Sequence, residues 1–294
     1  MPHPIHIVDV FSTSRYTGNP LAVVDEAGDL SGNEMLRVAA EMNFSETTFH
    51  GSTPEDDGSW LVRIFTPARE LAFAGHPILG TAWVIRERLG PDRPDHLRLR
   101  LPVGTIPVTF ERGPDGHETA WFLAPPVDLG PVCDPVPMAA ALHLEPRDLD
   151  LRAPIRQATA GVSLMIVPVR SLAALGRARL DLQAYAPLAE AGFPPLVYVF
   201  CPETHQPGHD FCARFFFEAH GVREDPAAGN ATAFLGAYLL EHPHGTGPEL
   251  DLRIEQGHRI GRPSLLLLRA RRAGAAREIR VGGQVLPALQ GVLV

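Results

Sequence analysis

The feature that most constrains this chain is a pair of similar segments, each leading into a helix that is apolar on nearly every face. One segment runs from Arg63 to Gly75 and the other from Arg214 to Gly229. In each, an Arg-x-Phe sequence is followed by a turn, by a glycine beside a polar residue, and by the apolar run. A helix without a polar face is buried rather than laid on a surface. The chain is therefore predicted to have two halves, each with a central helix wrapped by sheet.

The remaining patterns favour an α+β fold, because predicted strands outnumber predicted helices and do not alternate regularly with them. Alternating or continuous apolar stretches predict strands at 5–11, 21–24, 46–49, 60–65, 97–101, 106–110, 157–160, 164–167, 196–200, 212–217, 252–255, 265–269 and 279–281. Helices are predicted at 31–42, where Ser31 and Glu34 resemble a capping box, at 77–89, in the 180s and at 230–240. The Pro-rich stretch 124–128 predicts lobes of residues 1–124 and 125–294, with a terminal strand that could return to the first lobe.

Composition limits the function. The chain has 294 residues, 45% of them apolar and 20% charged, with a net charge of -8 and scattered basic residues. A nucleic-acid partner is therefore not expected. No run of about 18 apolar residues is present, so no membrane span is predicted. The N-terminus lacks a basic region followed by an apolar core, which favours a cytoplasmic location.

No cofactor is expected either. The chain contains no lysine, so all 26 residues of the combined Lys and Arg count are arginine. A pyridoxal-phosphate Schiff base and a P-loop both need a lysine, and both are excluded. The glycine-rich dinucleotide motif and the serine-hydrolase motif are also missing.

The cysteines and histidines do not predict a metal site. Cys133, Cys201 and Cys212 are odd in number and have no metal-type spacing. Two histidine pairs, at 205/209 and 242/244, lie among Pro and Gly residues that indicate exposed loops. Because no carboxylate or cysteine cluster accompanies either pair in the sequence, no metal is expected.

The two glycines that open the apolar helices are candidate ligand contacts. The N-terminus of a buried helix keeps free N–H groups and attracts an anion, and Gly75 and Gly229 allow a ligand close to the backbone. If the two lobes face each other, a small carboxylate would bind between them. The alternative is that both glycines only shape turns.

Three titratable residues lie next to these features. Glu46 stands at a helix-to-strand junction, where burial would raise its pKa and suit general acid–base catalysis; the alternative is a surface glutamate on an edge strand. His76 either carries a proton or caps its helix. Asp225, just upstream of the second helix, either assists or serves as a turn aspartate.

Several motifs together resemble those of the phenazine-biosynthesis PhzF-like family and span nearly the whole chain. They are GNPLAVV at 18–24, NFSET at 43–47, FTPARELAFAGHP at 65–77, EDPAAGNA at 224–231, EQG at 255–257, GRPS at 261–264 and VGG at 281–283. That family is similar in fold to diaminopimelate epimerase. The resemblance implies two pseudo-symmetric lobes, each a barrel-like mixed sheet around one central helix.

The resemblance also implies a function. Glu46 would take and return a proton with help from His76 and Asp225, without a cofactor, in a small carboxylic acid that is cyclic or carries an amino group. In the namesake member the substrate is a dihydro-hydroxyanthranilate. A homodimer is implied as well. Substrate contacts would come from Asn19, Ser45, the backbone of Gly75 and His76, Gly229, Asn230 and Ala231.

Departures from the related patterns leave alternatives open. Diaminopimelate epimerase has a cysteine before the glycine of each lobe, where this chain has Ala74 and Ala228, so a two-thiol mechanism is lost. The common family motif has Thr and Ser at Ala228 and Asn230, which affects the substrate rather than the proton chemistry. A single-carbon epimerase and a non-catalytic metabolite-binding protein on the same fold are the alternatives to an isomerase.

Overall fold

The computed structural model describes the whole chain except residues 1, 114–115, 221–223, 243, 245–246 and 275. The chain forms two compact units. The first comprises Met1–Leu123 and Gly282–Val294, and the second comprises Ala124–Val281. The C-terminal residues thus belong to the same unit as the N-terminus, and the boundary falls inside the strand β17 (Ala276–Gly283).

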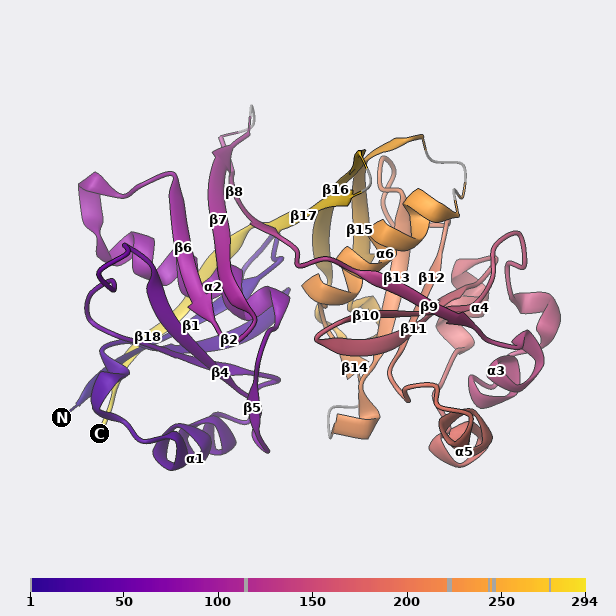
Figure 1. Cartoon of the computed structure of the whole chain (residues 1–294), viewed down its shortest axis with the longest axis horizontal. Coiled ribbons are helices and arrows are strands. Elements are labelled where there is room, and N and C mark those ends of the chain that lie inside the picture. The colour runs from indigo at the N-terminus through magenta and orange to yellow at the C-terminus, as the bar shows by residue number, and fades with distance from the viewer. Residues whose placement is uncertain (1, 114–115, 221–223, 243, 245–246, 275) are drawn as a thin grey trace. The chain divides into compact units, whose positions relative to one another are not determined.

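The first unit is a mixed sheet with two α-helices, α1 (Gly32–Met42) and α2 (Gly75–Arg88), labelled in Figure 1. Short 3-10 turns lie at η1 (Ala27–Asp29) and η2 (Gly90–Asp92). The strands pair in the order β18-β1-β2-β3-β4-β6-β7-β8, and β5 adds to β4. Their bounds are β1 (His3–Val10), β2 (Asn19–Val24), β3 (Thr47–His50), β4 (Trp60–Phe65), β5 (Glu70–Leu71), β6 (His96–Leu101), β7 (Gly104–Arg112), β8 (Glu118–Leu123) and β18 (Val285–Leu293).

The helix α2 is the centre of this unit. It packs against β1, β2, β3, β6, β7, β8 and β18, so the sheet curves around it. Nearly every side chain of α2 is buried, among them Ile78, Leu79, Ala82 and Ile85. The absence of a polar face on this helix is therefore explained by contacts on all sides.

The second unit has the same plan with more helices. The sheet order is β9-β10-β11-β12-β13-β15-β16-β17, and β14 adds to β13. The strands are β9 (Asp128–Val132), β10 (Arg156–Ala160), β11 (Val162–Pro168), β12 (Val197–Cys201), β13 (Phe211–Phe216), β14 (Glu224–Asp225), β15 (Glu249–Gln256), β16 (Ser264–Ala273) and β17. The helices are α3 (Pro135–Ala141), α4 (Leu172–Arg177), α5 (Leu182–Glu190) and α6 (Gly229–Glu241), with 3-10 turns at η3 (Pro146–Asp148), η4 (Glu218–His220) and η5 (His258–Ile260).

The helix α6 takes the place of α2 in this second unit. It packs against β9, β10, β11, β15 and β16, and all of its side chains except Asn230 and Glu241 are buried. The smaller helices α3, α4 and α5 pack elsewhere, α3 on α5 and α4 on β12 and β13.

Strand directions show that the two units repeat one topology. In the first unit β2–β3 and β4–β6 pair in parallel, and the other neighbours pair antiparallel. In the second unit the parallel pairs β11–β12 and β13–β15 stand at the same two places in the order. The predicted α+β fold with two pseudo-symmetric halves, each a sheet around a buried helix, is confirmed.

The repeated Arg-x-Phe sequence has the same structural role in both units. Arg63 on β4 forms two hydrogen bonds of 2.7 Å with Glu70 on β5. Arg214 on β13 forms the equivalent pair with Glu224 on β14, at 3.0 and 2.8 Å. Each guanidinium also lies over the phenylalanine two residues later. A bidentate arginine–carboxylate pair fixes geometry as well as charge. It therefore fastens the short strand that leads to the central helix.

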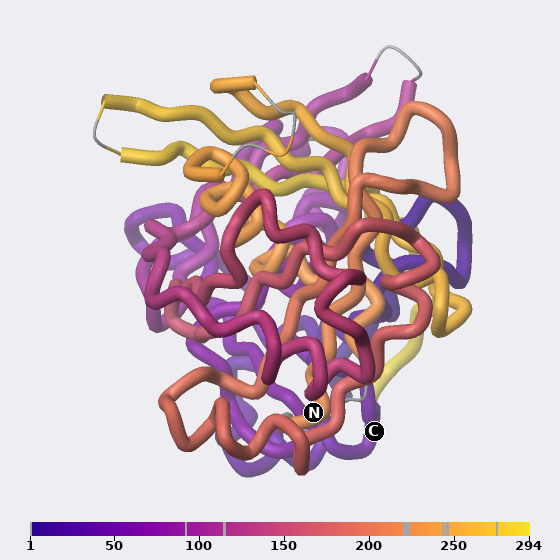
Figure 2. The backbone as a smooth tube through the Cα atoms, turned by 90° about the vertical axis from the view of Figure 1, so that its right-hand side faces the viewer, coloured from indigo at the N-terminus to yellow at the C-terminus, as the bar shows by residue number. Residues whose placement is uncertain are grey.

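The N-terminal region follows the sequence patterns closely. β1 and β2 form the predicted antiparallel hairpin, and α1 begins with the predicted capping box between Ser31 and Glu34. β1 also pairs along its length with β18, from His3 opposite Leu293 to Val10 opposite Val285. This pairing brings the two chain ends together, as Figure 2 shows.

Six helices and strands were not predicted from sequence patterns, namely α3, α4, β5, β8, β9 and β14, and the terminal strand β18 was predicted without bounds. The helices α3 and α4 have seven and six residues, too short to show a clear helical period. β18 contains Pro287 and Gly291, which weaken a strand pattern. The predicted strand at 46–49 is corrected by one residue, because Glu46 precedes β3 instead of belonging to it.

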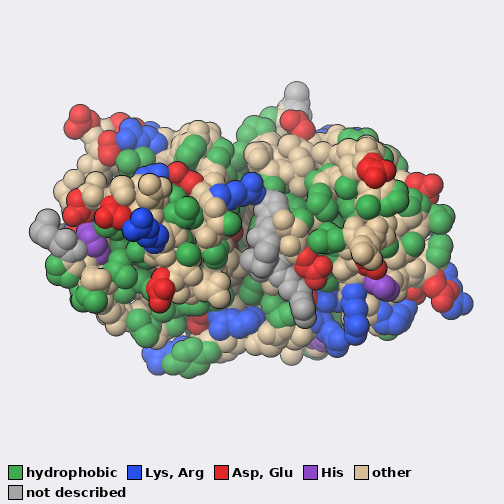
Figure 3. All heavy atoms as spheres, turned by 90° about the horizontal axis from the view of Figure 1, so that it is seen from below, with side chains coloured by type: hydrophobic (Ala, Val, Ile, Leu, Met, Phe, Trp, Pro, Cys, Tyr) green, Lys and Arg blue, Asp and Glu red, His purple; other side chains and the backbone are tan. Residues whose placement is uncertain are grey.

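Within the described parts of the chain, no helix is both long and apolar enough to cross a membrane. Acidic and basic side chains both occur across the face shown in Figure 3, with apolar side chains between them.

Candidate active site

Glu46 is buried at the junction between α1 and β3. Its side chain is 5% exposed, and the strand that follows it lies between β2 and β4. The alternative of a surface glutamate on an edge strand is therefore wrong. Ser45, the residue before it, is half-buried. The local sequence places the carboxylate where the chain leaves a helix, before the backbone enters the sheet.

His76 lies beside this carboxylate. It is the second residue of α2, is 3% exposed, and places Nε2 at 3.5 Å from Oε2 of Glu46. Burial lowers the pKa of His76 to about 3, so the ring is neutral at neutral pH. The N-cap residue of α2 is Ala74 and no side chain caps this helix, so the alternative of a capping histidine is wrong.

Asn19 determines which ring nitrogen of His76 carries the proton. Asn19 is fully buried at the start of β2, and its Nδ2 lies 3.2 Å from Nδ1 of His76. An amide nitrogen only donates, so Nδ1 must accept and the proton of the neutral ring is on Nε2. That N–H faces Glu46. Gly18 makes this placement possible, because it has φ +71° and a Cβ there would lie 2.4 Å from a backbone oxygen.

In the second unit, Asp225 lies at the end of β14 and is 7% exposed. Its Oδ1 accepts a hydrogen bond of 3.1 Å from the N–H of Ala227. The turn-aspartate interpretation is thus correct for this contact.

Gln256 fixes the segment from Asp225 to Ala228 by hydrogen bonds, a role that the sequence did not indicate. It is fully buried at the end of β15, donates from Nε2 to the backbone oxygen of Asp225 at 2.8 Å, and accepts from the N–H of Ala228 at 3.4 Å. One side chain thereby fixes both the aspartate and the residue before α6. The EQG motif at 255–257 marked Gln256 as part of the family pattern but did not indicate these contacts.

Four of the predicted substrate contacts, Gly75, Gly229, Asn230 and Ala231, lie at the starts of the two central helices. Gly75 begins α2 and Gly229 begins α6, and neither helix has a side-chain cap. N–H groups at such an end are available to an anion. In α6, the Oδ1 of Asn230 accepts a hydrogen bond of 2.9 Å from the N–H of Ala231, so this side chain contacts the backbone of the first turn of its own helix.

The alanines that precede these helices confirm what the sequence indicated about thiol chemistry. Ala74 and Ala228 are the N-cap residues of α2 and α6, and both are buried. A cysteine there would stand at a helix N-terminus, where its pKa is lowered. Alanine has no such group, so neither N-cap residue offers a thiol at the start of its helix.

The structure corrects one premise about the histidine pairs, namely that no carboxylate or cysteine accompanies them. Among the described residues, four side chains each place one possible ligand atom within 4.8 Å of the others: His205, Cys212, Glu255 and His258. Glu255 and Cys212, which sequence spacing did not reveal as neighbours, therefore lie beside His205 of the 205/209 pair. The other pair has different partners: His242 contacts Arg156, and His244 contacts Asp150.

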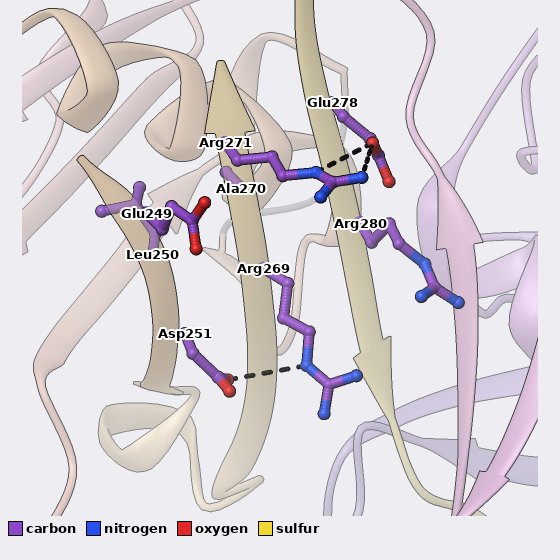
Figure 4. A pocket seen from close by; sticks show the side chains of 8 residues that line it. All are labelled: Glu249, Leu250, Asp251, Arg269, Ala270, Arg271, Glu278 and Arg280. Atoms are coloured by element: carbon purple, nitrogen blue, oxygen red, sulfur yellow. Dashed lines mark hydrogen bonds and ion pairs between the residues drawn. The ribbon is translucent and has the colours of Figure 1, made fainter. Parts of the chain in front are cut away.

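A charged pocket on the second unit shares none of the predicted site residues. It has a volume of about 390 Å³ and is lined along β15, β16 and β17, as Figure 4 shows. Arg271 pairs with Glu278 at 2.7 Å, and Arg269 lies 3.7 Å from Asp251. No histidine stands beside a carboxylate among the described residues that line it, so it does not offer the same proton chemistry.

Known proteins resemble this chain over nearly its whole length. Residues 8–291 match the family model described as phenazine biosynthesis-like protein. Trans-2,3-dihydro-3-hydroxyanthranilate isomerase of Pseudomonas aeruginosa is 37% identical over 276 residues, which cover 92% of each chain.

Solved structures show the same fold over the whole length. A PhzF-family protein of Bacillus anthracis superposes with a TM-score of 0.90 at 24% identity, covering 100% of this chain and 99% of the other. A predicted epimerase of Pseudomonas aeruginosa has a TM-score of 0.82 at 30% identity, covering 99% of both chains. With its family match and its isomerase relatives, this chain belongs to the phenazine biosynthesis-like protein family and is an isomerase.

Proposed function

We propose that this isomerase moves a proton within a small carboxylic acid, without a cofactor, and that Glu46 carries the proton. The observation that supports this most directly is the buried arrangement of Glu46, His76 and Asn19. A carboxylate at a water-poor position, oriented by a neutral histidine, is suited to general acid–base catalysis.

In this proposal Glu46 acts twice on one substrate molecule. As a carboxylate it removes a proton from one carbon, and as a carboxylic acid it returns a proton to another. One C–H bond breaks, another forms, and a double bond shifts between them, so the composition does not change. His76 stays neutral, because its pKa is about 3, and orients the carboxylate through its Nε2–H.

The substrate class follows from the helix starts and from the named relative. The uncapped starts of α2 and α6 are each suited to the carboxylate of a small acid. The relative that is 37% identical is named as an isomerase of trans-2,3-dihydro-3-hydroxyanthranilate, so that compound is the first substrate to test. Ala228 and Asn230 are where a different substrate would be selected.

The test is proton exchange in deuterated water, followed by NMR of the substrate. Glu46→Gln keeps the size and hydrogen bonding of the side chain but cannot carry a proton. We expect it to lower turnover and deuterium incorporation by a factor on the order of 10²–10⁴. Glu41→Gln, on the exposed end of α1, is the matched control and should retain wild-type rates.

Exchange by Glu46→Gln at the wild-type rate would remove Glu46 from the mechanism. His76→Ala and Asp225→Ala should cost less than Glu46→Gln, because their proposed roles are to orient and to assist. Binding of the acid with neither exchange nor turnover in the wild-type protein would favour a metabolite-binding protein instead.

A second candidate is epimerisation at one carbon. One observation favours it: the chain is 30% identical to the predicted epimerase of Pseudomonas aeruginosa whose structure is similar. The position of deuterium separates the two reactions. Isomerisation places the deuterium on a different carbon from the one that lost its proton. Epimerisation places the deuterium on the original carbon, with inverted configuration.

A further inference from the structure

A second cluster of reactive side chains lies in the second unit, away from the residues assigned to proton transfer. It is formed by His205 from the loop after β12, Cys212 on β13, Glu255 near the end of β15 and His258 in η5. One ligand atom from each lies within 4.8 Å of the others. Three separate stretches of the chain thus converge on one point.

The donor set is suited to zinc. Two imidazoles, one thiolate and one carboxylate are the ligand types that Zn²⁺ binds in tetrahedral sites. Hard cations such as Mg²⁺ and Ca²⁺ prefer oxygen ligands only, and the sulfur and nitrogen donors disfavour them. A thiolate and a carboxylate together would balance the charge of a divalent ion.

Glu255 is held as a metal-binding carboxylate would be. It is 1% exposed, and its Oε1 accepts from the N–H of Gln206 at 2.8 Å and lies 2.7 Å from Nδ1 of His209. Its Oε2 accepts from the N–H of His205 at 2.7 Å. An oxygen with a single hydrogen bond still has a lone pair for a metal. The contact with His209 would orient the carboxylate.

The histidines add an independent observation. The Nδ1 of His258 is buried and has no hydrogen-bond partner in the described structure. A buried polar atom without a partner is unfavourable unless a ligand satisfies it. The rings of His205 and His258 stack face to face with centroids 4.2 Å apart. Both line a small cavity of about 130 Å³ together with Cys212.

We propose that His205, Cys212, Glu255 and His258 bind one Zn²⁺, and that this zinc is structural. Four protein ligands complete a tetrahedral ion and leave no position for a substrate. The ion would fasten the loop after β12 and the turn η5 to the ends of β13 and β15. Because Gln256 follows Glu255 and holds Asp225 and Ala228, the zinc would also steady the start of α6.

The experiment uses the full chain, stripped with a chelator and titrated with ZnCl₂ in a buffer that does not bind metals. We expect one zinc per chain by elemental analysis after gel filtration, with a rise in the thermal unfolding midpoint. Co²⁺ bound in place of zinc should show tetrahedral visible bands and a thiolate-to-cobalt charge-transfer band. Cys212→Ser should remove the charge-transfer band.

Ligand variants decide which residues hold the ion. His258→Ala and Cys212→Ser should each weaken zinc binding by more than the roughly 10- to 100-fold typical of losing a residue that only orients a ligand. Cys201→Ala, on the strand opposite Cys212, and His143→Ala, on the surface, should bind zinc as the wild-type protein does. Circular dichroism of each apo variant confirms that it is folded.

The proposal is overturned if the folded wild-type chain binds less than one zinc, or if His258→Ala and Cys212→Ser bind it with unchanged affinity. It is also overturned if the cobalt spectrum lacks the thiolate band. None of these measurements depends on the isomerase substrate, so failure of the proposed function would leave the zinc result standing.

Discussion

At the scale of single residues, the contact between Asn19 and His76 controls the state of the histidine. Both are buried, and burial alone keeps the ring neutral by lowering its pKa to about 3. Asn19 adds direction, because its amide donates to Nδ1 and so leaves the proton on Nε2. The ring therefore presents an N–H to Glu46.

Replacing Asn19 by aspartate tests this account. A carboxylate within hydrogen-bond distance of Nδ1 favours the charged imidazolium. In Asn19→Asp we therefore expect the pKa of His76 to rise from about 3 toward its ordinary value of 6.5. Nitrogen-15 NMR of the imidazole, recorded as a function of pH, measures both the pKa and the tautomer.

Asn43→Asp is the matched control, since Asn43 is an exposed residue that ends α1. It should leave the His76 titration unchanged. An unshifted pKa in Asn19→Asp, with the fold intact, would show that Asn19 does not control the ring.

At the scale of elements, the turn after β15 is the most constrained connection to the candidate site. Gly257 has φ +80°, and a Cβ there would lie 2.2 Å from the backbone oxygen of Arg262 and 2.7 Å from that of Pro226. Those atoms belong to backbone and cannot rotate away. The same turn positions Gln256, which holds Asp225.

Gly257→Ala should therefore be more destabilising than Gly261→Ala. Gly261 also has a positive φ, of +71°, but a Cβ there would have no atom within 4 Å. The conformational penalty alone is about 1–2 kcal/mol, and overpacking adds roughly a further 1–3 kcal/mol at Gly257. Urea unfolding of the two variants measures the difference. Equal losses of stability would mean that the backbone contacts at Gly257 relax freely.

At the scale of the whole molecule, buried histidines make stability depend on pH. Burial lowers the pKa of both His76 and His50 below 6.5. In the unfolded chain a histidine titrates near 6.5, so below that pH the unfolded state binds protons that the folded state does not. The contribution of His76 to stability is complete above about pH 6.5 and is lost progressively down to about pH 3.

Acid should therefore destabilise the first unit before the carboxylates titrate. Each such histidine contributes a slope of at most about 1.4 kcal/mol per pH unit to the free energy of unfolding. The three tryptophans, Trp60, Trp83 and Trp121, all lie in the first unit, so their fluorescence follows its unfolding in urea. We expect the urea midpoint to fall between pH 6.5 and 4.5.

His76→Gln should reduce this dependence, because glutamine binds no proton in the unfolded state. His143→Gln, at an exposed position, should leave it unchanged. A pH dependence identical in His76→Gln and the wild-type protein would show that the ring is not held neutral by the fold.

Local sequence patterns were enough to predict the elements that depend on residues close together in the chain. An apolar run with no polar face predicted both buried helices, α2 and α6, because such a helix needs partners on every side. Ser31 and Glu34 predicted the start of α1, because a capping box joins residues three apart. The motifs around Glu46, His76 and Asp225 indicated the family before any contact was known.

Features that depend on contacts between distant residues became visible only in the folded structure. Glu46 is buried because β3 lies between β2 and β4, and β18 forms despite Pro287 because β1 offers it a partner along its whole length. The clustering of His205, Cys212, Glu255 and His258 required three stretches of chain to meet. Periodicity in a sequence reports which face of an element is apolar. It does not report which element lies against that face, because that depends on packing between residues far apart in the chain.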